Sequence, residues 1–335
     1  MDMKGLVCPV PWQHCEVGHD HCVYLCCHLP TSVGSLVGRE VIDVWWSPTA
    51  VRIRQDILVG DYKYCRRSTC PILEQPIVPT ADWWRHTMAL RPLEPAEMMP
   101  YPRAPLRLSL SNERSCNLAC TSCRKTHYRG SDPRLATVLS SVRRSLPAAD
   151  VLKLCGSGEF SLSEELCQFA SQALREHPRL RLELLTNLTT FGARELEALG
   201  WRGRVSQICG SLDASTPETY AKVRGGNFKV VKSNLLSLQE IKDSDHIDLV
   251  AIFVVSAVNF REMPDVALEM RDLGVKVNFL RVQDWGHLSR EEFADLDVGS
   301  PSHPLHDELL DVMTSPHLRA EHVRLGDLLK LLPAK

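Results

Sequence analysis

The chain lacks long hydrophobic runs and an excess of charge of either sign. Its longest apolar stretches, such as VAIFVVSAV, are far too short to span a bilayer, so no membrane segment is expected. The 39 basic residues are balanced by 41 acidic ones, and the net charge of −2 does not favour a nucleic-acid or anionic-membrane partner. The first residues, MDMKGLVCPVPW, contain no apolar signal core, from which we expect a cytoplasmic protein.

Cysteine, by contrast, is abundant and unevenly distributed. Of the 13 cysteines in 335 residues, seven lie within residues 1–70, three within residues 116–123, and none follows Cys209. The length suffices for two domains, and 44% hydrophobic with 24% charged residues is typical of a globular chain. In such a chain clustered cysteines favour metal sites in a reducing compartment over disulfides.

The most informative cluster is Cys116-Asn-Leu-Ala-Cys120-Thr-Ser-Cys123, which follows the apolar segment LRLSL. Three thiolates on one tight loop suit an iron–sulfur cluster, with one iron left open for a small molecule. A structural zinc site would need a fourth ligand, and His127 could supply it. Spacing alone therefore fits either metal.

Four segments follow one another along the chain. We expect a cysteine-rich domain over residues 1–75, a proline-rich bridge over 76–104, strand–helix units over 105–285 and a helical extension over 286–335. Repeated strand–helix units predict a parallel sheet with helices outside, and six of them predict an α/β fold, a partial (β/α)6 TIM-like barrel. Ligands in parallel barrels bind at the carboxyl ends of the strands. The six expected strands are 106–110, 151–156, 181–187, 205–213, 248–255 and 277–282.

Two helices carry recognisable end signals. Ser161 followed by Glu164 predicts a capping box at the start of one helix. Asn259 suits the N-cap of another, and Gly274 suits its C-terminal end.

The cysteine triplet and the motifs after it resemble the radical S-adenosylmethionine (SAM) superfamily, over roughly Leu106 to Trp285. The resemblance implies a [4Fe-4S] cluster on Cys116, Cys120 and Cys123, with SAM bound at the open iron. It also implies reductive cleavage of SAM to a 5′-deoxyadenosyl radical that abstracts hydrogen from a substrate, with electrons from a reductant such as flavodoxin or ferredoxin. Ser122 stands where the family often has an aromatic residue.

The later motifs imply contacts to SAM. In the family, a glycine-rich segment ending in an acid meets the methionyl amine, a Thr-Asn segment lies beside SAM, a Ser-x-Asp element contacts it, and an arginine pairs with its carboxylate. The matching residues here are Gly156, Ser157, Gly158, Glu159, Asn187, Ser211 and Arg224. Plainer roles stay open for them: a helix-initiating acid for Glu159, a turn for Asn187 and a solvated helix end for Arg224.

Further residues could act on the substrate. Asp284 and His287, in VQDWGHL after the last strand, could remove a hydroxyl proton, or they could simply belong to a capped turn. Cys209 or Cys155 could return a hydrogen atom, although such cysteines are more often buried packing residues.

The N-terminal segment resembles a SPASM-type module, although that module usually follows the barrel. The resemblance implies one auxiliary [4Fe-4S] cluster held by Cys8, Cys26, Cys65 and Cys70. Cys27 is the alternative to Cys26, since neighbours on a strand face opposite ways. A zinc module using nearby histidines is the other alternative for this domain.

Together these resemblances predict a radical SAM oxidoreductase or epimerase. Its expected substrate is a small polar molecule, such as a carbohydrate or aminocyclitol natural product, that is dehydrogenated or epimerised. Two alternatives stay open: a maturase that modifies a ribosomal peptide, and a non-catalytic iron–sulfur redox or sensor protein.

Overall fold

The computed structural model describes residues 8–66, 70, 104–130, 132–154, 156–284 and 287–332. The chain divides into two compact units, one of Met1–Arg114 with Gly130–Leu182 and the other of Ser115–Arg129 with Glu183–Lys335. Among the helices in the described ranges, none has the length and apolar character needed to cross a membrane.

In the described part of the first unit, the strands follow the order β3-β2-β1-β4-β5. β1 pairs antiparallel with β2, whereas β1 and β4, and β4 and β5, pair in parallel. The strands are β1 (His14–Val17), β2 (Cys22–Tyr24), β3 (Gly34–Ser35), β4 (Arg107–Leu110) and β5 (Val151–Leu154).

Side chains alternate between two unlike faces of these strands. Cys15, Leu108 and Leu152 occupy matched positions of β1, β4 and β5, and all three are fully buried. On the opposite face, Glu16 is paired with Ser109, which is paired in turn with Lys153. The apolar face forms part of the core, and the other face carries polar side chains.

Helices complete the first unit. The first-unit helices are α1 (Val10–Gln13), α2 (Val41–Trp45), α3 (Pro48–Leu58), α7 (Leu135–Arg143), η1 (Leu146–Ala148), η2 (Phe160–Leu162) and α8 (Glu164–Glu176). Arg54 of α3 is buried, where its guanidinium donates to the carbonyls of Pro11 and Trp45 at 2.9 and 2.7 Å. This arginine therefore ties α3 to the backbone of α1 and α2.

The second unit continues the strand–helix alternation, in the order β6-β7-β8-β9-β10. β7, β8, β9 and β10 pair in parallel with their neighbours, as expected when helices connect successive strands. The strands are β6 (Arg181–Thr186), which begins at the unit boundary, β7 (Val205–Ser211), β8 (Asp248–Val255), β9 (Lys276–Arg281) and β10 (Val323–Arg324).

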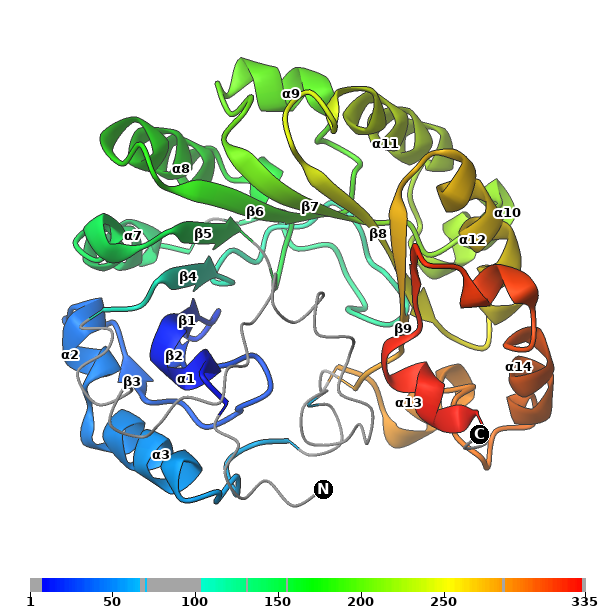
Figure 1. The fold of residues 1–335 in the computed structure, drawn as a ribbon, viewed down its shortest axis with the longest axis horizontal. Coiled ribbons are helices and arrows are strands. Elements are labelled where there is room, and N and C mark those ends of the chain that lie inside the picture. The colour runs from blue at the N-terminus through cyan, green and yellow to red at the C-terminus, as the bar shows by residue number, and fades with distance from the viewer. Residues whose placement is uncertain are drawn as a thin grey trace. The chain divides into compact units, whose positions relative to one another are not determined.

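The helices α9 to α12 lie along one side of strands β7 to β9 (Figure 1). Fully buried Phe253 of β8 and Phe279 of β9 stack with ring centroids 5.3 Å apart in the core of this unit. The second-unit helices are α9 (Ala193–Ala198), α10 (Pro217–Val223), α11 (Phe228–Ile241), η3 (Phe260–Glu262), α12 (Met263–Asp272), α13 (Arg290–Leu296), α14 (His306–Val312), η4 (Pro316–Arg319) and η5 (Gly326–Leu331).

The α/β class and all six predicted strands are confirmed, each within a few residues. The partial barrel and the four predicted domain segments stay predictions. Gly274 follows α12 with φ +61°, and the amides of Gly274 and Val275 bond back to the carbonyls of Arg271 and Met270, which confirms its C-terminal role.

The capping prediction at Ser161 is wrong. Helix α8 begins at Glu164, and its N-cap is Ser163, whose hydroxyl accepts from the amide of Leu166. Ser161 instead donates to Glu159 at 2.8 Å, because the short helix η2 occupies residues 160–162.

Candidate functional site

The three cysteines of the triplet lie in one loop of the second unit that closes on itself. The amide of Cys116 donates to the carbonyl of Tyr128 at 2.8 Å, which joins the two ends of the loop. Cys116 and Cys120 are each 8% exposed and pack with buried Leu118, while Cys123 is half-buried beside them. The three cysteines therefore belong to one largely buried cluster around Leu118.

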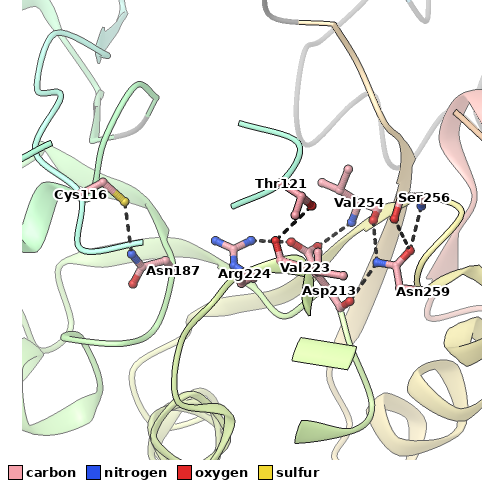
Figure 2. A network of polar contacts seen from close by, with 9 residues as sticks. All are labelled: Cys116, Thr121, Asn187, Asp213, Val223, Arg224, Val254, Ser256 and Asn259. Atoms are coloured by element: carbon pink, nitrogen blue, oxygen red, sulfur yellow. Dashed lines mark hydrogen bonds and ion pairs between the residues drawn. The ribbon is translucent and has the colours of Figure 1, made fainter. Parts of the chain in front are cut away.

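Electrostatics places a cation beside these thiols. Burial raises the pKa of the Cys120 thiol to about 11; Arg224 opposes this shift, whereas Asp213 and the other two thiols add to it. The backbone amide of Thr121 donates to the carbonyl of Val223 at 2.9 Å, and its hydroxyl donates to the same carbonyl at 3.3 Å (Figure 2). The cysteine loop is thus tied to the end of α10, directly before Arg224.

The zinc alternative gains no fourth ligand from His127. His127 is exposed, and nowhere in the described ranges do three or more His, Cys, Asp or Glu side chains converge on one metal ion. Ligands of one tetrahedral zinc have to lie within about 4 Å of one another. Thiols that ligate separate irons of a cluster do not have to converge in this way.

Arg224 and Asp213 form a buried ion pair at 2.5 Å, with side chains 11% and 3% exposed. Burial alone would lower the pKa of Arg224, but Asp213 and the Cys120 thiol raise it well above its ordinary value. The Nη1 atom of Arg224 is used by Asp213, whereas its Nε is buried without a hydrogen-bond partner. The buried hydroxyl of Tyr220, which also has no hydrogen-bond partner, interacts electrostatically with this guanidinium.

Asn259 holds the strained backbone of Asp213, which has φ +57°. Its amide group donates to the carbonyls of Asp213 and Val254, both at 2.9 Å, and its oxygen accepts from the amide of Ser256 at 2.8 Å (Figure 2). The carboxylate of Asp213 also accepts from the amide of Val254. Asn259 is the N-cap of the short helix η3 without a side-chain cap bond, whereas α12 begins at Met263, so the predicted N-cap of that helix is displaced. Sequence reasoning missed the contact with Asp213, because the two residues lie 46 positions apart.

Asn187, at the end of β6, is 6% exposed and bonded to protein groups. Its Nδ2 donates to Oδ1 of Asn117 at 3.0 Å and to Sγ of Cys116 at 3.8 Å, while its Oδ1 accepts from the amide of Thr189 at 2.9 Å. The predicted contact between Asn187 and SAM stays a prediction.

The glycine-rich segment lies in the first unit. Gly156 has φ +101°, and a Cβ at this position would lie only 2.4 Å from Cβ of Ser111, so close packing already requires the glycine. Glu159 is 1% exposed and accepts from Ser161, and Ser157 lies 3.5 Å from His19 through Oγ and Nδ1. The SAM-binding roles of Gly156, Ser157, Gly158 and Glu159 stay predictions.

The residues proposed to act on substrate are spread over different environments. Cys209 and Ser211 are half-buried on the same face of β7, where the thiol of Cys209 donates to Oε1 of Gln207 at 3.6 Å. Asp284 and His287 are exposed. Cys155 lies outside the described residues.

The four cysteines predicted to hold an auxiliary cluster lie in the first unit. Burial raises the pKa of Cys8 to about 12, and the thiols of Cys70 and Cys65 add to the shift. The pKa of Cys26 is raised by a hydrogen bond with Cys27, by burial and by the nearby Cys27 and Cys8 thiols.

Tyr62 connects parts of this cysteine group. Its hydroxyl accepts from the amide of Cys8 at 3.2 Å, and its carbonyl accepts from the amide of Cys65 at 3.0 Å. Cys8 and Cys70 are buried, Cys26 and Cys65 half-buried, and Cys27 exposed. A hydrogen bond with Cys26 lowers the pKa of the Cys27 thiol, and the choice between Cys26 and Cys27 as the ligand stays a prediction.

Sequence reasoning also missed the polar face of the first unit. Nε2 of His14 lies 2.9 Å from Oγ of Ser109, and Oγ of Ser111 donates to Oε1 of Glu16 at 2.9 Å. Alternation within His-Cys-Glu-Val was the available signal, since it places His14 and Glu16 on one side of a strand.

No protein-family model and no curated protein matches the chain, but solved structures do. SuiB of Streptococcus suis bound to S-adenosylmethionine matches with a TM-score of 0.43 and 13% identity, over 63% of this chain and 48% of SuiB. SuiB bound to its precursor peptide SuiA matches with a TM-score of 0.44 and 13% identity, over 79% of this chain and 60% of SuiB. The structure of anSMEcpe with bound AdoMet matches with a TM-score of 0.44 and 17% identity, over 62% of this chain and 57% of anSMEcpe.

The chain thus spans about half to three-fifths of the length of these proteins. At these scores and identities the likeness is loose and concerns the general fold alone. The chemistry assigned to this chain rests on its own residues.

Proposed function

We propose that the chain is a radical SAM enzyme whose [4Fe-4S] cluster is held by Cys116, Cys120 and Cys123. The observation that carries the proposal is the gathering of three thiols from one loop beside a buried arginine whose Nε has no partner. A structural metal site has no use for such a cation, whereas a bound carboxylate does.

The donor set fits the cluster. Three soft sulfur ligands suit iron, and a three-ligand set leaves one iron open for another molecule. Burial keeps the Cys120 thiol protonated at neutral pH, so cluster binding has to release its proton. Arg224 assists because its charge stabilises the thiolate form of Cys120.

The arginine fits SAM. Arg224 would bind the methionyl carboxylate, Asp213 would fix the guanidinium, and Asn259 would fix the backbone of Asp213. Glu159 keeps its proposed role toward the amine. When bound, cluster and SAM together would supply reductive cleavage of the sulfonium and removal of a hydrogen atom from substrate.

For the substrate we propose a small polar molecule with a hydroxyl or amine next to the attacked carbon. Dehydrogenation would use Asp284 or His287 as the base, whereas epimerisation would use Cys209 or Cys155 as hydrogen donor. A ribosomal peptide is the alternative substrate, and the SuiB and anSMEcpe structures include complexes with peptides. Cys8, Cys26, Cys65 and Cys70 would hold the auxiliary cluster that accepts or relays an electron.

Anaerobic turnover tests the proposal. Protein reconstituted with iron and sulfide is incubated with SAM and dithionite, and 5′-deoxyadenosine is measured by mass spectrometry. We expect its formation in the wild type and its loss in Cys120→Ala. Arg224→Lys should raise the KM for SAM about tenfold or more, because a bidentate contact is lost.

Two panels, one of aminocyclitols and carbohydrates and one of peptides, then identify which substrate class increases 5′-deoxyadenosine formation. Cluster-loaded protein that never cleaves SAM would contradict the enzyme proposal and favour a redox or sensor protein.

A further inference from the structure

Asn187 makes a contact that the proposed SAM site does not require. Its Nδ2 lies 3.8 Å from Sγ of Cys116, in a buried hydrogen bond between β6 and the cysteine loop (Figure 2). The residue is 6% exposed and Cys116 is 8% exposed, so water does not compete effectively for the bond. Sulfur is a weak acceptor as a thiol, but it becomes a stronger one as a thiolate bound to iron.

The orientation of the Asn187 amide is fixed by its neighbours. Its Oδ1 accepts from the backbone amide and the hydroxyl of Thr189, at 2.9 and 2.5 Å. Since the oxygen is engaged on that side, the NH₂ group is directed toward Asn117 and Cys116. A flipped amide would place its oxygen against Oδ1 of Asn117 and its NH₂ group against the backbone amide of Thr189, so it would lose the bonds to both groups.

Asn117 supports this orientation from the cysteine loop itself. Its Nδ2 donates to Oγ1 of Thr189 at 2.8 Å, which leaves its Oδ1 to accept from Asn187 at 3.0 Å. Because Asn117 directly follows Cys116, the interlocked amides also fix the backbone that presents the sulfur. Each of the three side chains therefore defines the direction of the other two.

We propose that Asn187 is a positioning residue that donates a hydrogen bond to the Cys116 thiolate and thereby raises the reduction potential of the cluster. The inference rests on the proposed function, since it needs a cluster on Cys116. The added electron increases negative charge on the sulfurs, and a fixed donor stabilises that charge. The bond would make the cluster easier to load with an electron from the external reductant.

The test is a redox titration of the reconstituted protein without SAM or substrate, followed by electron paramagnetic resonance of the reduced cluster, with iron content as a second readout. Asn187→Leu keeps the shape of the side chain but removes the donor. Asn187→Asp keeps the acceptor for Thr189 and removes the donor to sulfur. Asn234→Leu is the matched control, because it removes an amide that donates to the carbonyl of Leu188, directly after Asn187, but that is not bonded to Asn117, Asn187, Thr189 or Cys116.

We expect both Asn187 variants to retain wild-type iron content at the triplet and to be harder to reduce. The ratio of reduced to oxidised cluster at a fixed ambient potential should fall about tenfold, which corresponds to about 59 mV for one electron. The shift should be larger in Asn187→Asp, which adds a negative charge, and Asn234→Leu should remain close to the wild type.

Unchanged potentials in both Asn187 variants would overturn the proposal, as would equal shifts in all three variants, which would indicate general distortion of the loop. If Asn187→Leu does not bind iron, the reduction potential of Asn187→Asp alone decides whether the proposal holds. If the wild type assembles no cluster, the proposed function and this proposal are both rejected. If the cluster forms but its reduction potential is unchanged in the Asn187 variants, only the role of Asn187 is rejected.

Discussion

Arg224 and Asp213 are the buried charges on which the proposed site depends most. Asp213→Asn keeps the shape of the carboxylate but leaves the guanidinium of Arg224 buried without a counter-charge. Breaking a buried pair in this way costs about 3–5 kcal/mol. We therefore expect the free energy of unfolding, measured in urea, to fall by about that amount.

The exposed pair of Lys276 with Asp248 is the matched control, since its side chains are 50% and 37% exposed. Lys276→Ala should cost at most about 1 kcal/mol, because solvent screens the pair. Equal losses in Asp213→Asn and Lys276→Ala would contradict the prediction that the buried pair contributes more to stability than the exposed one.

His14 predicts a pH dependence of stability. Burial lowers its pKa in the folded state, although Glu16 opposes the shift, and Nδ1 is shielded without a partner. The unfolded chain therefore binds a proton more readily as the pH falls through about 6.5. Stability should drop from pH 7.5 to 5.5, by up to about 1.4 kcal/mol per pH unit for this group.

Urea unfolding of the wild type and of His14→Gln at both pH values checks this prediction. The variant should lose less stability than the wild type between pH 7.5 and 5.5, whatever its stability at pH 7.5. Parallel losses in the two proteins would assign the pH dependence to other groups.

At the scale of elements, strands were more predictable than the contacts between them. LRLSL and VAIFVV are apolar runs that fit buried parallel strands, and both form strands. β1 could not be predicted, because His14–Val17 is short and its stability depends on pairing with β4, which lies far along the chain. The predicted start of α8 was wrong for a similar reason. The short helix η2 occupies the residues before Ser163, so the N-cap lies two residues after the predicted one.

The cap of α8 allows a test at this scale. Ser163→Ala removes the hydroxyl that accepts from the amide of Leu166, which should cost about 1 kcal/mol of stability. Glu164→Ala is the control from the predicted capping box, and it should cost less, because Ser163 still accepts from the amide of Leu166. Thermal unfolding of both variants decides, and a larger loss for Glu164→Ala would contradict the cap at Ser163.

For the whole molecule, spacing predicted the cysteine triplet because its three ligands lie within eight residues. The residues that orient the site, such as Asn259 and Asn117, could not be predicted from spacing, because they bond to partners from other elements. Local motifs carry ligand chemistry, whereas the hydrogen bonds that orient the ligands depend on tertiary packing.

Iron content tests both cysteine groups in the complete chain. Two cubane clusters predict about eight irons and eight sulfides per reconstituted protein. The triple variant Cys116→Ala/Cys120→Ala/Cys123→Ala should retain about four irons, and Cys8→Ala/Cys70→Ala should also retain about four. Cys167→Ala is the matched control: this buried thiol bonds to the carbonyl of Phe160 and belongs to neither group, so the full iron content should remain. If the wild type instead contains about four irons and one zinc, and the zinc is lost in Cys8→Ala/Cys70→Ala, the first unit is a zinc module. The triplet would then keep its cluster.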